Sequence, residues 1–166
     1  MYRELVKDLF LSLLIVLSQL LIFNHINLFG TVSTFIYVSL FILYKTTYDK
    51  TYLILFGFIV GLIIDLSLQT YGAHTLASIT VCYLKERIEK YSFGVNSTLP
   101  LAMIRGTQQT NRVTYFFLII FLHSLIYFSL IFFKFEFALT IFLFTLINSI
   151  INFIIIWIIS MLIFDK

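Results

Sequence analysis

Few residues in this chain have side chains that commonly do chemistry, and their spacing matches none of the common catalytic motifs. Among 166 residues there are three histidines and one cysteine, Cys82. The sequence contains no HExxH pair, no GxSxG serine and no glycine-rich phosphate loop. Its long apolar stretches hold a single aspartate, so the paired carboxylates of an aspartic protease are missing as well. The sequence therefore predicts a protein that is not an enzyme, has no cofactor and no metal site, and keeps Cys82 as a buried thiol.

Asp65 is the charged residue that interrupts an apolar stretch, where an ionisable group is costly unless it is paired or hydrated. Gly57 and Gly61 precede it at intervals of four residues, so all three share one face of a helix. A GxxxG pair lets another helix approach closely, although the pattern is common in membrane helices. We therefore expect this face to pack against a second helix.

The partner of Asp65 should come from the far side of the next turn. Gly72 lies in or beside that turn and His74 follows it, so His74 should reach a depth similar to that of Asp65. We expect His74, or a hydroxyl such as that of Ser67 or Thr75, to be the partner. The alternatives are a carboxylate that reaches the lipid headgroups without a partner, and a proton or cation site.

Two further polar groups lie within apolar segments near the end of the chain. Thr145, Asn148 and Asn152 are spaced three and four residues apart, so they share one helix face. Amides at such depth usually hydrogen-bond to another helix, and a ligand contact is the alternative. His123 is expected to be a neutral, hydrogen-bonded histidine.

The elements that position these residues follow from composition. The chain is 61% hydrophobic and 11% charged, with 20 Phe, against roughly 25% charged residues in soluble domains. Such a chain is predicted to be an all-α, polytopic membrane bundle, because its apolar residues form continuous runs rather than the alternation of a barrel strand. Residues 1–166 form one integral membrane domain with six expected spans, at 9–28, 30–45, 51–69, 72–88, 113–133 and 138–163.

Basic residues orient this bundle, because cytoplasmic segments collect Lys and Arg. With both termini in the cytoplasm, Lys134 is the only basic residue left outside. The longest polar segment, on the cytoplasmic side, is expected to bind lipid headgroups or to dock a partner. Its candidate docking residues are Lys85, Arg87, Lys90, Arg105 and Arg112.

The stretch from Gly57 to Leu84 resembles a helical hairpin of the MreD family of bacterial rod shape-determining proteins. That pattern has glycine and leucine, two apolar residues, aspartate, a short outer turn, and then glycine, one residue, histidine and alanine. The matching positions here are Gly61, Leu62, Asp65, Gly72, His74, Ala77, Tyr83 and Leu84. The likeness covers about residues 55–84, while the other spans match only in length and hydropathy.

This resemblance implies a non-catalytic component of the cell-elongation complex in the bacterial inner membrane. It implies binding to the bitopic protein MreC through transmembrane helices, near the MreB filament and the peptidoglycan synthase. It also implies the six-helix fold of the substrate-binding subunits of energy-coupling factor vitamin transporters. Such a transporter subunit is the alternative function. Against it, the first span has Ser12 facing Val16, where those subunits carry a pair of small residues.

Overall fold

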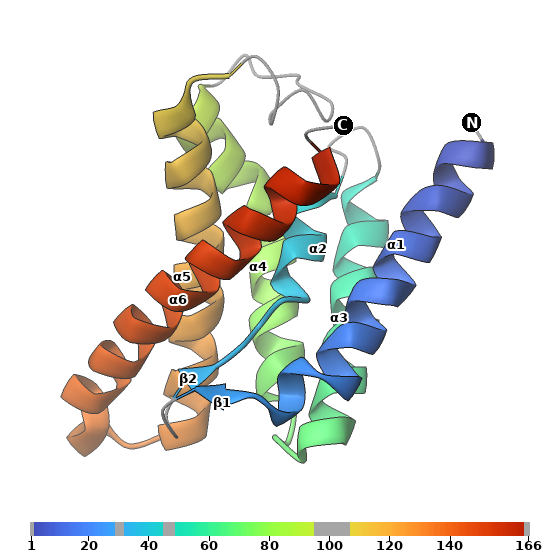
Figure 1. Cartoon of the computed structure of the whole chain (residues 1–166). Coiled ribbons are helices and arrows are strands. Elements are labelled where there is room, and N and C mark those ends of the chain that lie inside the picture. The colour runs from blue at the N-terminus through green and yellow to red at the C-terminus, as the bar shows by residue number, and fades with distance from the viewer. Residues whose placement is uncertain (1, 29–31, 45–48, 95–106, 165–166) are drawn as a thin grey trace.

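The computed structural model describes residues 2–28, 32–44, 49–94 and 107–164. Helices run side by side along the length of the molecule, and a short antiparallel strand pair closes one end (Figure 1). Five helices are long: α1 (Tyr2–Leu21), α3 (Lys50–Leu68), α4 (Ala73–Phe93), α5 (Gln109–Phe132) and α6 (Ala138–Phe164). The short elements are α2 (Val38–Leu43), the 3-10 turns η1 (Phe23–His25) and η2 (Phe135–Phe137), and strands β1 (Asn27–Leu28) and β2 (Val32–Ser33).

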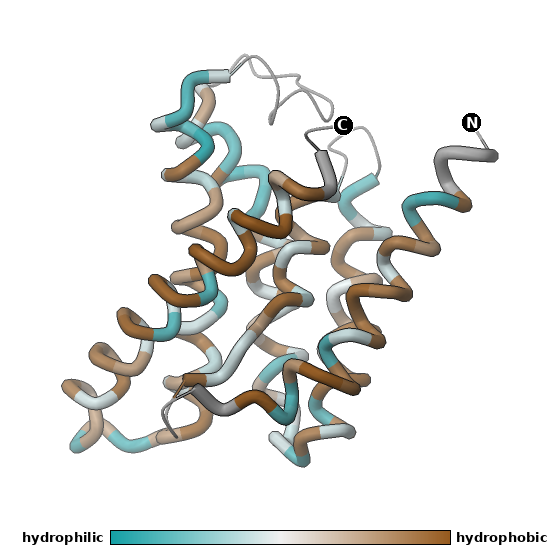
Figure 2. The backbone as a smooth tube through the Cα atoms, viewed as in Figure 1, coloured by the Kyte–Doolittle hydropathy of each residue, from teal (hydrophilic) through white to brown (hydrophobic). Residues whose placement is uncertain are grey.

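Within the described residues, four helical segments are long and apolar enough to cross a membrane. They are Val6–His25, Lys50–Leu68, Gln109–Phe132 and Phe135–Leu162, and between 11% and 44% of each apolar window is buried inside the protein. Most of their apolar surface therefore faces outward, which suits lipid and not water. Figure 2 shows these apolar residues along α1, α3 and α6, with hydrophilic residues gathered where α4 ends and α5 begins. The chain is thus nearly all helical and has the character of a membrane protein.

The expected spans agree with the helices to within a few residues at α3 and α6, and less closely elsewhere. The helix expected at 9–28 begins and ends about seven residues earlier, and α4 continues to Phe93 instead of ending at residue 88. The second half of α4 carries Lys85, Glu86, Arg87, Glu89 and Lys90, which explains why it is not among the apolar crossing candidates.

The span expected at 30–45 is not a continuous helix, so this prediction is wrong for its first half. Strand β2 pairs with β1, aligning Asn27 with Ser33, and α2 begins only at Val38. Residues 32–35 lie before the turn at Ile36 and Tyr37 that leads into α2, and the buried β-branched Val32 and Thr34 suit an extended conformation. The backbone hydrogen bonds of this segment come from side chains of other helices, as described below.

Successive helices pack as neighbours, with α4 between α3 and α5, and α6 against α5. Figure 1 shows that α1, α3 and α5 begin at one end of the bundle, where α4 and α6 end. The β1–β2 pair and the turn between α3 and α4 lie at the opposite end. Residues 32–44 run from the strand end toward the other end, and α2 is visible between α6 and α1 in this view (Figure 1).

Candidate functional site

The Asp65 carboxylate lies at the start of α4 and accepts hydrogen bonds from both backbone and side chains there. Its Oδ1 atom accepts from the His74 backbone N–H at 3.0 Å and from the Thr70 hydroxyl at 2.5 Å. Its Oδ2 atom accepts from the Thr75 backbone N–H at 2.7 Å and from the Thr75 hydroxyl at 2.5 Å. These bonds occupy both oxygens of a side chain that is only 5% exposed, so Asp65 is not left without a partner.

This arrangement makes Asp65 a helix cap supplied by a neighbouring helix. The first backbone N–H groups of a helix have no acceptor within it, and a negative charge there is favoured by the helix dipole. Because α4 begins at Ala73, the amides of His74 and Thr75 belong to its first turn. The expected partner is therefore Thr75, while His74 contributes its backbone and not its imidazole. Ser67 instead accepts a hydrogen bond from Asn24 at 3.2 Å.

Gly57 and Gly61 bring α3 close enough to α4 for this cap to form. A Cβ atom on Gly61 would lie 2.6 Å from Cα of Thr75, and one on Gly57 would lie 2.6 Å from Sγ of Cys82. Both contacts are shorter than real Cβ atoms show. At Gly61 the atom met is backbone, so the helix packing requires this glycine, whereas at Gly57 it is the end of the Cys82 side chain, which can move. The GxxxG face is therefore filled by a helix of the same chain.

The turn that joins these helices needs a left-handed backbone. Gln69, Tyr71 and Gly72 all have positive φ, with φ of 93° at Gly72, the residue before α4 begins. Glycine adopts this conformation without the steric cost that a side chain adds. Gly72 thus serves the turn, and no other atom lies within 4 Å of where its Cβ would be.

The His74 imidazole belongs to a second polar centre, which is fully buried between the segment 32–44, α4 and α5. The Tyr37 hydroxyl lies 2.8 Å from Nδ1 of His74 and 2.7 Å from Nε2 of His123. A hydroxyl has one proton to donate, so one ring presents a bare nitrogen to Tyr37 and the other presents an N–H. The hydrogen bond agrees with the expectation for His123, and Tyr37 is a partner that the sequence did not indicate.

Aromatic rings surround this centre. The Phe35 ring meets the His74 and His123 imidazoles edge-on, with centroid distances of 5.4 and 5.3 Å. The Tyr127 ring lies 4.4 Å from that of His74. The second ring nitrogens, Nε2 of His74 and Nδ1 of His123, have no hydrogen-bond partner within the described residues. The centre joins three segments into one core and leaves neither imidazole accessible from outside.

Side-chain amides hold the extended segment that precedes α2. Asn148 Oδ1 accepts from the Ser33 N–H at 2.9 Å. Asn152 Oδ1 accepts from the Phe35 N–H at 2.5 Å, while its Nδ2 donates to the Ser33 carbonyl at 2.9 Å. The two amides of α6 therefore act like a neighbouring strand, and their partner is extended backbone instead of the helix that we expected. The Thr145 hydroxyl has no hydrogen-bond partner within the described part of the chain.

Gln19 of α1 completes this support from the other side, and the sequence analysis missed it. Its Nε2 donates to the Thr34 carbonyl at 2.8 Å, and its Oε1 accepts from the Tyr37 N–H at 3.3 Å. Irregular backbone is tolerated at membrane depth only where protein groups satisfy it. A glutamine in an apolar helix was the available signal, but nothing in the sequence paired it with Thr34 and Tyr37.

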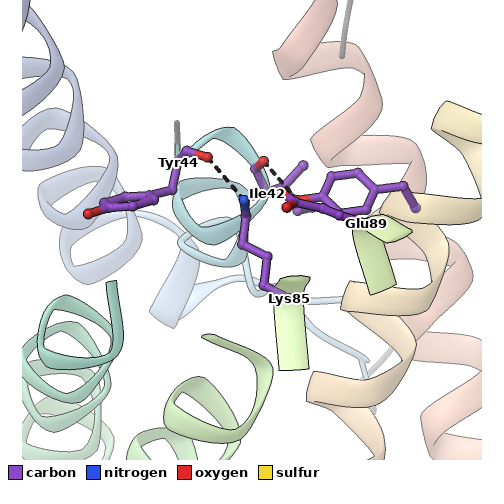
Figure 3. A network of polar contacts seen from close by, with 5 residues as sticks. Ile42, Tyr44, Lys85 and Glu89 are labelled. Atoms are coloured by element: carbon purple, nitrogen blue, oxygen red, sulfur yellow. Dashed lines mark hydrogen bonds and ion pairs between the residues drawn. The ribbon is translucent and has the colours of Figure 1, made fainter. Parts of the chain in front are cut away.

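A third network fixes the end of α2, as Figure 3 shows. Lys85 forms an ion pair with Glu89, and both side chains are almost completely buried. Lys85 Nζ also donates to the Tyr44 carbonyl at 3.1 Å. The Tyr115 hydroxyl lies 3.2 Å from the Ile42 carbonyl and 3.3 Å from Oε1 of Glu89. Lys85 is therefore a structural residue, and its expected role in docking is wrong because its charge is buried and paired.

The other expected docking residues have different surroundings. Arg87 and Lys90 are exposed on α4, and Lys90 pairs with Glu86 at 2.7 Å. The Arg112 guanidinium lies 5.7 Å from the centre of the Trp157 ring. Arg105 lies outside the described residues. Of the set, Arg87 and Lys90 thus remain available on the surface of α4.

Side chains that could hold a metal ion are sparse among the described residues. Among them, no group of three or more His, Cys, Asp and Glu side chains is placed to bind a metal. Asp65 already accepts four hydrogen bonds, which use the lone pairs of an ionised carboxylate. To coordinate a cation it would have to give up part of the cap of α4. The polar groups of this core hold segments together.

Comparison with known proteins adds no assignment to this picture. No protein-family model, no curated protein and no solved structure matches the chain. A functional proposal therefore depends on the residues of the chain and on the contacts between them.

Proposed function

We propose that this chain is a non-catalytic scaffold in the bacterial inner membrane, part of the complex that elongates rod-shaped cells. It binds an MreC-like bitopic protein through transmembrane helices, near the MreB filament and the peptidoglycan synthase, and in this way regulates cell shape and peptidoglycan synthesis. The likeness of residues 55–84 to the MreD family supports this role.

The observation that carries the proposal is the way in which the residues of that likeness meet. Gly61 allows close packing on α4, Asp65 caps α4, and Gly72 forms the turn between the two helices. His74 then ties α4 to the segment 32–44 through Tyr37. Gly61, Asp65 and His74 each contact another segment of the same chain, which suits a scaffold whose shape is its function.

The proposal includes six membrane crossings with both termini in the cytoplasm. The crossings are α1, residues 32–44, α3, α4, α5 and α6, and the second is extended in its first half. Lys7, Lys50 and Arg112 lie near the starts of α1, α3 and α5, at the same end as the last turns of α4, whereas Lys134 follows α5 at the other end. This distribution supports a cytoplasmic location for the basic end.

A partner helix has to pack on the outer faces of the bundle, since the glycine and amide faces are occupied within it. Apolar exposed faces suited to this are found on the first and last helices, α1 and α6. On α1 the exposed residues include Leu9, Phe10, Leu13 and Leu17, and on α6 they include Leu139, Phe142, Ile150 and Ile154. Van der Waals packing on these faces is the means of binding that we propose.

Copurification tests the proposal directly. The tagged full chain, expressed in its own host and extracted in a mild detergent, should retain a single-span protein, and depletion of the chain should turn rod-shaped cells round. Two paired variants locate the binding face: Phe10→Ser with Leu13→Ser on α1, and Phe142→Ser with Ile150→Ser on α6. The pair on the face that binds the single-span protein should lose it, and the other pair should retain it. If no bitopic partner copurifies and depleted cells stay rod-shaped, the proposal fails. A vitamin that remains bound through purification would instead favour the transporter subunit.

A further inference from the structure

A group of charged residues surrounds Tyr83 where α3 begins and α4 approaches its end. Lys50 Nζ lies 4.4 Å from the centre of the Tyr83 ring, and the Arg87 guanidinium carbon lies 6.0 Å from it. Tyr83 is 49% exposed, Arg87 is exposed and Lys50 is partly exposed, so the cluster can be reached from outside the protein. We call Lys50, Tyr83, Glu86, Arg87 and Lys90 the Tyr83 cluster.

The Tyr83 cluster has more positive than negative charge. Glu86 is its one carboxylate, and it is paired with Lys90 at 2.7 Å. Lys50 and Arg87 also act on Glu86 electrostatically, but neither forms an ion pair of its own with any carboxylate in the described ranges. The cluster therefore has a surplus of two positive charges.

In the buried part of α4, by contrast, the positive and negative charges are equal in number. Lys85 is paired with Glu89 and donates to the Tyr44 carbonyl, while the Tyr115 hydroxyl bonds to Glu89. Two residues along α4, Arg87 lies beside the Tyr83 ring and forms no ion pair with a carboxylate of the described ranges. Two cations beside one ring, on the outside of a membrane protein, leave room for an anion from outside the chain.

The surface next to the Tyr83 cluster indicates which anion this is. Beyond Lys50, α3 exposes Leu55, Phe58 and Leu62, which form an apolar surface leading away from the cations. Tyr52 and Tyr91 are 69% and 79% exposed near the same end, as expected of aromatic residues at a membrane interface. Cations at the border of an apolar helix surface match a phospholipid, with its phosphate at the cations and its acyl chains along the helix.

We propose that the Tyr83 cluster binds the headgroup of an anionic phospholipid, with Lys50 and Arg87 contacting the phosphate and Tyr83 holding both cations in place. The cation–π contacts orient the two side chains before the lipid arrives. This inference concerns a lipid and does not depend on the partner protein proposed above.

Lipid retention by the purified full chain tests this site. Delipidated protein in a neutral detergent is titrated with phosphatidylglycerol or with phosphatidylcholine, and bound lipid is counted by native mass spectrometry. The unmodified chain should prefer phosphatidylglycerol. The pair Lys50→Gln with Arg87→Gln should weaken phosphatidylglycerol binding by about tenfold or more, since each basic residue near a membrane surface contributes roughly a fivefold gain for an anionic lipid.

Two matched variants make the test specific. Lys7→Gln with Lys134→Gln removes the same charge elsewhere and should leave the preference intact. Glu86→Gln raises the positive surplus of the cluster and should strengthen phosphatidylglycerol binding. Equal losses in the two glutamine pairs, no gain with Glu86→Gln, or no preference for phosphatidylglycerol in the unmodified chain would each overturn the proposal. Binding of an acidic peptide without any lipid preference would assign the Tyr83 cluster to a protein partner and would also overturn it.

Discussion

The cap that Asp65 supplies to α4 predicts strong energetic coupling between Asp65 and Thr75. Thr75→Val keeps the backbone N–H bond to Oδ2 and removes the hydroxyl bond to the same oxygen. A hydrogen bond to a charged group contributes about 1.5 to 3 kcal/mol, and this is the expected loss in the free energy of unfolding. Thr80→Val is the matched control, because the Thr80 hydroxyl bonds only to the Leu76 carbonyl of its own helix, at 2.8 Å.

Asp65→Asn should cost more than Thr75→Val. An asparagine keeps one acceptor oxygen, but it places an NH₂ group where the second carboxylate oxygen accepted hydrogen bonds, for example those from the Thr75 N–H and hydroxyl. Two donors at one oxygen then lose their acceptor, and leaving a buried donor unpaired costs roughly 1 to 3 kcal/mol. We expect a loss of about 3 kcal/mol in the free energy of unfolding, including the lost attraction between the carboxylate and the start of the helix.

The assay is a double-mutant cycle on the full chain, with unfolding followed by titration of a mild detergent with a denaturing one. Asp65→Asn combined with Thr75→Val should be less destabilising than the sum of the single changes, by about 1 kcal/mol or more, because one bond is counted in both. Asp65→Asn combined with Thr80→Val should be additive. Strict additivity for Asp65 and Thr75 would refute the cap.

Three further predictions follow from the packing and the buried networks. Gly61→Ala should destabilise the fold by about 1 to 3 kcal/mol, and by more than Gly57→Ala. The new Cβ at residue 61 meets the backbone of α4, whereas the one at residue 57 meets the movable Sγ of Cys82. Equal effects of the two changes in thermal unfolding would contradict this. Asn152→Leu should lower the free energy of unfolding by about 2 to 4 kcal/mol, because it leaves the Phe35 N–H and the Ser33 carbonyl without their side-chain partner. A loss below 1 kcal/mol would argue against this role of Asn152. Lys85→Met should lower the free energy of unfolding by about 3 to 5 kcal/mol, because it leaves the Glu89 charge buried and unpaired. Lys85→Met combined with Glu89→Met should recover most of this stability. A double variant as unstable as the single one would count against the buried pair.

The long helices are the part of the fold that the sequence predicts well, because continuous apolar runs leave few other solutions in a membrane. The α3–α4 hairpin was also predictable in outline, since Asp65 and the residues after Gly72 had to meet across a short turn. What the sequence could not assign was which atoms of His74 would be used. The choice depends on Tyr37, whose position beside His74 is fixed only by the folded core.

The segment 32–44 shows why the remaining part was not predictable. A short apolar run reads equally well as a buried strand or as part of a helix. The extended form is decided by Asn148 and Asn152, and the acceptor of the Ser33 N–H lies 115 residues away in the chain. The Lys85 and Glu89 pair is different, because its spacing of four residues is visible in the sequence. Only its burial required the structure.

The amide support of residues 32–37 has a consequence for how the protein is made. The Ser33 and Phe35 amides need acceptors from α6, which leaves the ribosome long after they do. Until α6 is made, these two amides lack the acceptors that they have in the folded protein, and unpaired backbone amides are costly away from water. The segment can therefore take its final path only after α6 is available. The order of synthesis thus makes α6 the element that completes the bundle.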